Sequence, residues 1–105
     1  MFEPFSRGYY LGRLYVEPSA EERATMHART HERVGEEVYG GESDVLVMKL
    51  DGYHLAVEGE EGVPEGTLAV PRDVLEDTSV RNPPSLQEVL LAKADRAAQL
   101  LEMGA

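Results

Sequence analysis

Apolar and polar residues alternate, or recur with a helical period, along most of this chain, and the pattern predicts six main elements. The first is a strand at residues 9–16, a run of aromatic and aliphatic side chains. Because successive side chains of a strand point to opposite faces, alternation predicts two faces. One carries Tyr9, Leu11, Arg13 and Tyr15, and the other carries Tyr10, Gly12, Leu14 and Val16.

A helix is predicted from Ala20 to Tyr39. Ser19 and Glu22 form a capping box at its start, and Gly40 follows its last residue as a helix stop. The apolar stripe of this helix is thin, and two histidines fill positions in it. The stripe reads Ala20, Ala24, His27, His31, Val34 and Val38.

The dipeptide Asp51-Gly52 stands between two apolar runs, residues 45–50 and 53–57, and predicts a two-residue β-hairpin. A loop of this length fixes the register, so that Leu50 pairs with Tyr53 and Leu46 with Val57. One hairpin face is wholly apolar and is expected to be core: Leu46, Met48, Leu50, Tyr53, Leu55 and Val57. The other face is half apolar and is expected to be partly covered: Val45, Val47, Lys49, His54, Ala56 and Glu58.

The rest of the chain predicts a loop, a short strand, a helical turn and a second long helix. Residues 58–66 are acidic and glycine-rich, residues 67–70 are strand-like, and residues 72–77 suit one helical turn. Ser85 and Glu88 repeat the capping box, which predicts a helix over residues 85–103. Its broad apolar arc contains Leu86, Val89, Leu90, Leu91, Ala94, Ala97, Ala98, Leu100 and Leu101.

The predicted order is therefore strand, helix, strand, strand, strand, helix. In a chain of 105 residues this order predicts a single α+β domain over residues 1–105. We expect a small, mainly antiparallel sheet with two helices packed on it.

Acidic residues outnumber basic ones by 20 to 10, which gives a formal net charge of −10. The absence of cysteine excludes a disulfide framework and a cysteine nucleophile. No apolar run approaches the ~20 residues of a membrane span, and the first residues do not resemble a signal peptide. We therefore expect a cytoplasmic protein with no membrane association, for which nucleic acid is an unlikely partner because no basic patch is present.

Two interpretations of the acid excess remain open. Glu is abundant, Lys is almost absent and Ile is absent, which suits a halophilic protein whose acidic surface stays solvated in molar salt. An ordinary acidic bacterial protein is the alternative. Disorder is not favoured, because Leu, Val and Phe are frequent enough to form a core.

Two stretches of the sequence resemble a group of short haloarchaeal proteins of unknown function. They are GYYLGRLYVEP (residues 8–18) and LEDTSVRNPPSLQEVLLAKADRAAQLL (residues 75–101). The resemblance covers most of the chain, and the second stretch is long enough to be specific. It implies a cytoplasmic halophilic protein and assigns no activity and no functional residue.

His27 and His31 are the best candidates for chemistry. Histidines at positions i and i+4 share a helix face and can chelate one metal ion. Such a site needs a further ligand from a neighbouring segment or a second copy. Two other interpretations stand beside it: partly buried histidines hydrogen-bonded within the fold, and a pH-sensitive interface.

No catalytic motif is present, and no cofactor is expected. We therefore predict a non-enzymatic protein of otherwise unknown biochemical role. A strand with three tyrosines and Arg13 also resembles the base-stacking faces of single-strand binders, although the net charge opposes that function.

Together, the predicted helices, hairpin and aromatic N-terminus offer more apolar surface than a two-layer domain of this size easily buries. A homodimer is the common solution, and a monomer whose helices cover each other is the alternative. We predict a protein-interaction or homo-oligomeric module. The expected interface residues are Tyr9, Tyr10, Tyr15, Leu91 and Ala98.

Overall fold

The computed structural model describes residues 3–5, 8–40, 45–81, 83–92 and 94–102. Within these ranges, side chains are described from Leu11 onward, except for those of residues 94–96. Within these ranges the chain forms seven strands and three helices. In chain order they are β1 (Glu3–Phe5), β2 (Gly8–Ser19), β3 (Ala24–His27), α1 (Ala28–Tyr39), β4 (Leu46–Leu50), β5 (Tyr53–Glu60), β6 (Thr67–Pro71), α2 (Arg72–Asp77), β7 (Ser85–Leu91) and α3 (Ala94–Glu102).

Six of these strands close into a mixed β-barrel in the order β2-β6-β3-β5-β4-β7, because β7 also pairs with β2. The β2–β6 and β3–β5 pairs are parallel, and the other four pairs of the barrel are antiparallel. The short strand β1 adds to one edge of β2. The predicted α+β sheet with two helices packed on it is therefore wrong, since strand residues clearly outnumber helix residues in the described chain and the sheet closes on itself.

Closure of the sheet turns one face of every barrel strand inward, and this face forms the core. The alternation of each strand supplies apolar residues to it, which removes their surface from water. The inward residues are Leu14, Val16, Ala24, Met26, Leu46, Met48, Leu50, Leu55, Val57, Leu68, Val70, Val89 and Leu91.

The hairpin prediction is confirmed. β4 and β5 pair in the predicted register, from Leu50 with Tyr53 to Leu46 with Val57, and Asp51 and Gly52 both have positive φ, as the turn requires. Tyr53 is the exception on the predicted core face, with 40% of its surface exposed. It lies at the hairpin tip, beyond the end of the barrel interior.

The predicted helix over residues 85–103 is wrong in its first part. Residues 85–91 form strand β7, which lies between β2 and β4, and helix α3 begins only at Ala94. The Ser85 hydroxyl accepts a hydrogen bond from Gln87 Nε2 at 2.8 Å. The backbone groups of this segment pair with β2, and this long ladder replaces the helix that the local pattern favours.

The predicted helix over residues 20–39 is wrong in the same way. Ser19 Oγ accepts a hydrogen bond from the backbone N–H of Glu21 at 3.0 Å, but this turn leads into strand β3 rather than a helix. β3 fills the position between β5 and β6. The helix begins at Ala28 and ends as predicted, with Gly40 in the left-handed conformation after Tyr39.

The predicted strand near the N-terminus is present and longer than expected. Leu14 and Val16 point into the barrel, and Arg13 and Tyr15 are exposed. A bulge between Tyr10 and Gly12 shifts the register against β7, and Gly12 has φ of +116°. Strict alternation therefore does not continue through the bulge to Tyr9 and Tyr10, whose side chains lie outside the described part.

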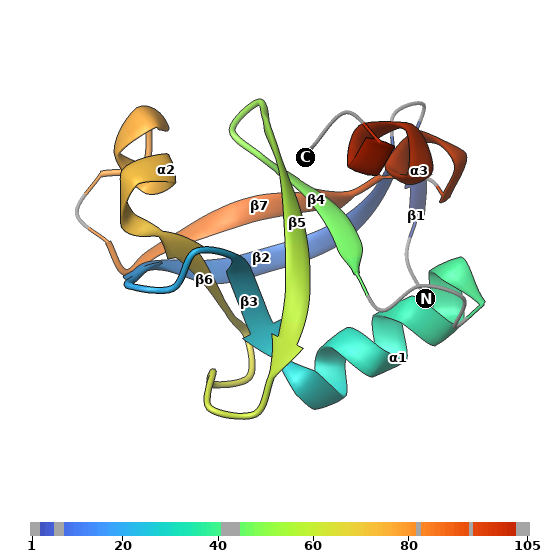
Figure 1. Cartoon of the computed structure of the whole chain (residues 1–105), viewed down its shortest axis with the longest axis horizontal. Helices are drawn as coiled ribbons and strands as arrows, with labels where there is room; N and C mark the ends of the chain where they lie inside the picture. The colour runs from blue at the N-terminus through green and yellow to red at the C-terminus, as the bar shows by residue number, and fades with distance from the viewer. Residues whose placement is uncertain (1–2, 6–7, 41–44, 82, 93, 103–105) are drawn as a thin grey trace.

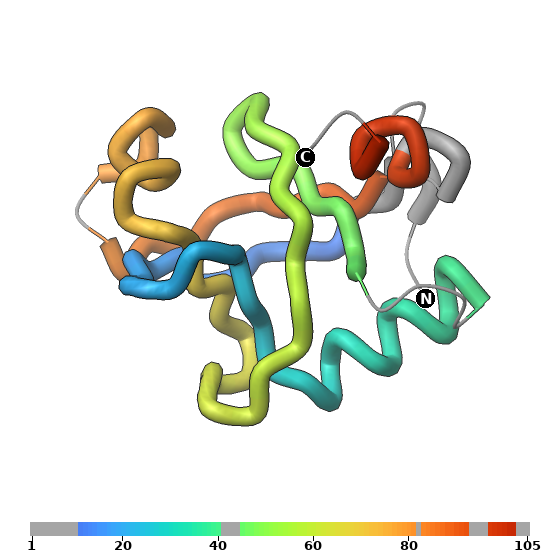
Figure 2. The backbone as a smooth tube through the Cα atoms, in the orientation of Figure 1, coloured from blue at the N-terminus to red at the C-terminus, as the bar shows by residue number. Residues whose placement is uncertain are grey.

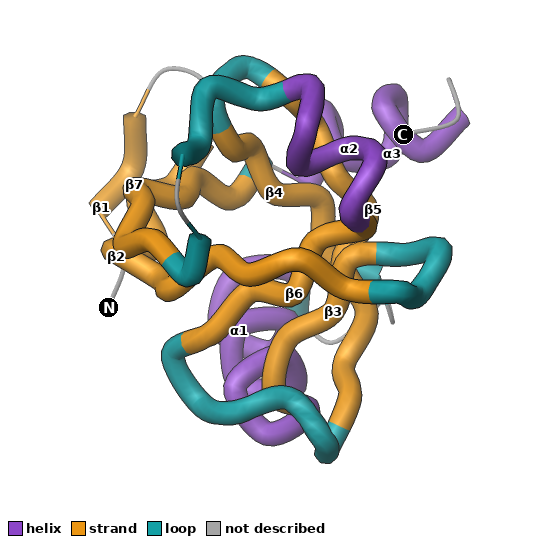
Figure 3. The backbone as a smooth tube through the Cα atoms, turned by 90° about the vertical axis from the view of Figure 1, so that its left-hand side faces the viewer, coloured by secondary structure: helices purple, strands orange, loops and turns teal. Residues whose placement is uncertain are grey.

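The helices lie outside the barrel. In Figures 1 and 3, α2 and α3 lie toward the top and α1 toward the bottom. α1 packs against β5 and β3, α2 against β6 and β2, and α3 against β4. The Tyr39 hydroxyl donates to the carbonyl of Ala92 at 2.5 Å, so the end of α1 is fixed to the segment that links β7 to α3.

No helix in the described part of the chain is long and apolar enough to cross a membrane. The path of the chain in Figure 2 shows instead that β2 and β7, from opposite ends of the sequence, run side by side along the barrel wall.

Candidate functional site

The two histidines predicted to share a helix face occupy different elements. His27 is the last residue of β3 and the N-cap of α1, where its Nδ1 accepts a hydrogen bond from the backbone N–H of Arg29 at 3.2 Å. His31 lies in the first turns of α1 and is buried. Its Nε2 lies 2.8 Å from the carbonyl oxygen of Val57. Because a carbonyl oxygen only accepts, Nε2 of His31 carries the proton.

His31 lies where α1 crosses β5 closely. A Cβ added to Gly59 would lie 3.2 Å from the Cα of Ala28 and 3.3 Å from the Cβ of His31, so any larger residue here would require the helix to move slightly away from the strand. His31 therefore joins helix to barrel, which agrees with the interpretation of a histidine hydrogen-bonded within the fold. Among the residues that the structure describes, no three His, Asp or Glu side chains are placed to hold a metal ion. The metal site stays a prediction, and within the described ranges it has no third ligand.

The outer face of the β2–β7 pair carries large apolar side chains in water. Tyr15 of β2 is 54% exposed and Leu86 of β7 is 45% exposed. They are directly opposite each other in the register of the two strands, so they form one continuous apolar patch. We call the four residues Arg13, Tyr15, Leu86 and Glu88 the β2–β7 outer face.

Arg13 and Glu88 are the neighbouring cross-strand pair on this face. The Arg13 Nη2 and Glu88 Oε1 atoms lie 3.9 Å apart, and their side chains are 62% and 66% exposed. This distance is beyond hydrogen-bond range, and an exposed pair of this kind contributes little to stability. The outer face thus carries one positive and one negative charge on a chain whose net charge is −10.

The remaining predicted interface residues have different positions. Leu91 is fully buried in the barrel core, so it cannot contact a partner in this fold, and that assignment is wrong. The prediction of an exposed Leu91 depends on a helix over residues 85–103, which the structure replaces with strand β7 up to this residue. Ala98 is exposed on α3, and the side chains of Tyr9 and Tyr10 lie outside the described part.

Leu86 and Glu88 were not recognised as surface residues from the sequence. Residues 85–91 fit a helical stripe and also a strand in which Leu86, Glu88 and Leu90 face outward while Val89 and Leu91 face inward. The strand pattern is present in the sequence, because it places the charged Glu88 outside and two β-compatible residues inside, but it is no stronger than the helical one. The isolated segment does not decide between the two periods.

A second exposed tyrosine lies at the tip of the β4–β5 hairpin. Tyr53 donates a hydrogen bond from its hydroxyl to the carbonyl of Asp77 at 2.9 Å. Beside it, Asp51 Oδ2 accepts from the backbone N–H of Ser79 at 2.6 Å. Among the effects on Asp51, this bond is the largest, and it lowers the pKa of the carboxyl group below its ordinary value. Both contacts attach the hairpin tip to the end of α2 and the segment after it.

Tyr53 also borders a groove of about 620 Å³. The groove runs past the hairpin, with Val74 of α2 on one side and Leu101 of α3 on another. Arg23, at its edge, is already engaged with Glu58, with 2.6 Å between Nη1 and Oε2. The apolar rim of Tyr53 and Leu101 is the other place where large apolar side chains are exposed in the described part of the chain.

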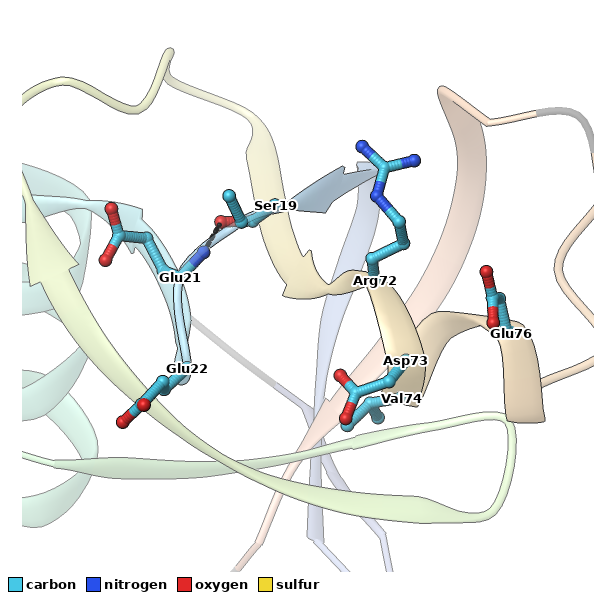
Figure 4. Close-up of a pocket in the computed structure, with 8 residues that line it drawn as sticks. Ser19, Glu21, Glu22, Arg72, Asp73, Val74 and Glu76 are labelled. Atoms are coloured by element: carbon cyan, nitrogen blue, oxygen red, sulfur yellow. Dashed lines mark hydrogen bonds between the residues drawn. The ribbon is translucent and has the colours of Figure 1, made fainter.

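A more polar hollow of about 530 Å³ lies between the turn after β2 and helix α2. Figure 4 shows Glu21 and Glu22 on the turn with their carboxylates pointing away from the carboxylate of Glu76 on α2. Arg72 extends away from Asp73 in the same view. The carboxylates do not converge on a common point, so the arrangement has no geometry for a cation.

The family model of DUF5802, described as a family of unknown function, matches residues 1–105. The chain belongs to this family. No curated protein and no solved structure matches it.

Proposed function

We propose that this member of the DUF5802 family is a non-enzymatic interaction module that works as a homodimer. The observation that carries the proposal is the pair of neighbouring, exposed apolar side chains Tyr15 and Leu86 on the barrel wall. A barrel strand can place any polar residue outward at no cost to its core. Two large apolar residues facing each other there suit a surface that is covered in the working protein.

The distribution of polar groups supports binding rather than catalysis. Both described ring-nitrogen contacts of His27 and His31 are made to the backbone of the same chain, and the carboxylates of the hollow beside α2 diverge. The Tyr53 hydroxyl, too, is bonded to the backbone. These groups therefore act in the fold, whereas the β2–β7 outer face has no comparable role in it.

We further propose that the protein works in concentrated salt, in the cytoplasm of a halophile. The support is the charge of −10, which produces repulsion between two copies and within each copy in dilute buffer. Molar salt shortens the range of that repulsion to ~3 Å. Association of two such chains is therefore expected to strengthen with salt.

Sedimentation equilibrium in 0.2 M and 2 M KCl tests the dimer. We expect a mass of twice 11.6 kDa in 2 M KCl and a smaller average mass in 0.2 M KCl, with circular dichroism showing that the fold is intact in both. A mass of one chain at both salt concentrations, at chain concentrations up to the millimolar range, would contradict the proposal.

A further inference from the structure

We propose that two copies of this chain associate face to face through the β2–β7 outer face, about a twofold axis that runs parallel to these strands. This inference rests on the proposed dimer and specifies where and how it forms. It follows from the register of four side chains, Arg13, Tyr15, Leu86 and Glu88.

The register of β2 against β7 arranges the outer face as two rows. Tyr15 lies opposite Leu86, and Arg13 lies opposite Glu88. A twofold axis between the strands, and parallel to them, places β2 of one copy over β7 of the other. Tyr15 then lies against Leu86 of the second copy, and Arg13 against Glu88 of the second copy. Each row therefore makes two favourable contacts across the interface.

Charge favours a second copy as the occupant of this face. The chain carries twice as many acidic as basic residues, so most pairings of its surface with itself bring like charges together. The β2–β7 outer face has one charge of each sign. The twofold axis places the positive charge of each copy against the negative charge of the other. A strongly basic partner would instead be attracted to the more acidic parts of the surface.

The weak contact between Arg13 and Glu88 within one chain agrees with this arrangement. At 3.9 Å with both side chains mostly exposed, neither group has to break a strong bond before it pairs with the other copy. Two arginine–carboxylate contacts would form across the interface, where water is partly excluded and their geometry can improve.

A stable dimer would have to cover only a modest share of the surface of this chain. A standard interface buries about 800 Å² on each partner, which is about one eighth of the 6481 Å² of accessible surface of this chain. Tyr15 and Leu86 form the apolar centre of such a contact. The partly exposed Glu17 and Leu90, which continue the outward rows of the two strands, lie at its border.

Charge reversal tests the arrangement, with sedimentation equilibrium as the measurement at the lowest salt concentration at which circular dichroism shows the native fold. Arg13→Glu places like charges together and is expected to weaken dimerisation about tenfold or more, as is Glu88→Arg. The double variant restores opposite charges in both contacts of the Arg13–Glu88 row and should restore most of the wild-type affinity. Arg29→Glu changes the net charge by the same amount as Arg13→Glu, but at an exposed position of α1. It should have little effect on dimerisation.

Tyr15→Ser provides a second test in 2 M KCl, where charge has less influence. The side chain is exposed, so the barrel should remain folded while the mass falls to that of one chain. Leu101→Ser, at the rim of the groove beside Tyr53, should leave the dimer intact. If the wild type is a dimer and neither Tyr15→Ser nor the charge reversals weaken it, the assignment of the face is wrong although the dimer stands. If the wild type is a monomer, both proposals fail.

Discussion

Two exposed tyrosines, Tyr15 and Tyr53, differ in what they do for the fold. Tyr53 lies at the hairpin tip, and its hydroxyl is bonded to the carbonyl of Asp77. Tyr15 is more exposed, at 54% against 40%, and its neighbour across the strands is the exposed Leu86. Exposure of an aromatic ring therefore does not by itself indicate an interface.

The contrast lies in how the two regions are attached to the rest of the barrel. β7 pairs with β2 over its whole length but with β4 only through residues 90 and 91. The hairpin tip is instead attached to the segment after α2 by the bonds of Asp51 and Tyr53. On the β2–β7 side the strands are joined by their backbone ladder, and the outward side chains of Tyr15 and Leu86 are exposed.

The largest expected effect separates the inner and outer faces of β7. Leu91→Ala should lower the free energy of unfolding by about 2–5 kcal/mol, because it leaves a cavity in the barrel core. Leu86→Ala should change it by about 0.5 kcal/mol or less. Urea unfolding at a low chain concentration measures both. A large loss for Leu86→Ala would mean that the outer face is needed for folding.

A smaller effect should distinguish the two tyrosines. Tyr53→Phe removes the hydrogen bond to Asp77 and should cost about 1 kcal/mol of unfolding free energy. Tyr15→Phe removes no hydrogen bond that the described structure contains and should have almost no effect. Equal losses for the two variants would remove the distinction between them.

The concentration dependence of stability sharpens the same comparison. A ligand or partner that binds only the folded state raises the melting temperature by mass action. The melting temperature of the wild type in 2 M KCl should therefore rise with chain concentration, and that of Tyr15→Ala should not. Tyr53→Phe should keep the wild-type slope. A slope that is absent in all three proteins would argue against self-association.

The smallest expected effect concerns the pH dependence of the hairpin tip. The Ser79 N–H lowers the pKa of Asp51 in the folded state. Its stabilising contribution is therefore present above the unfolded-state pKa of ~3.9 and is lost as the pH falls through the lower folded-state value.

Asp51→Asn is the matched control, because asparagine tolerates the positive φ of 49° at this position and keeps an acceptor for Ser79. The stability of the wild type relative to this variant, measured by urea unfolding, should decline below about pH 4. A difference that is constant from pH 7 to pH 2.5 would show that the carboxylate charge contributes nothing.

Local signals in the sequence predicted those elements whose partners are close in the chain. Asp51-Gly52 specified the hairpin and its register correctly, and Gly40 marked the end of α1. The short helix over residues 72–77 also agrees with prediction. In each case the physical cause, a turn geometry or a helix end, lies within a few residues of the signal.

The candidate face could be predicted only in part. Alternation placed Arg13 and Tyr15 on one side of their strand, and both are exposed. Their neighbours Leu86 and Glu88 could not be identified, because residues 85–91 fit a helical period as well as a strand period. The strand period applies only because β2 offers these residues a partner 70 or so positions away in the chain.

The sequence by itself therefore determined the acidic character, the hairpin with its register and the shared strand face of Arg13 and Tyr15. Tertiary structure decided that residues 24–27 and 85–91 are strands and that the sheet closes into a barrel. The reason is that a strand obtains its backbone hydrogen bonds from other segments, whereas a helix obtains them from itself. Local propensity does not indicate which distant strands have unpaired edges. In the closed barrel, residues 24–27 pair with β5 and β6, and residues 85–91 pair with β2 and β4.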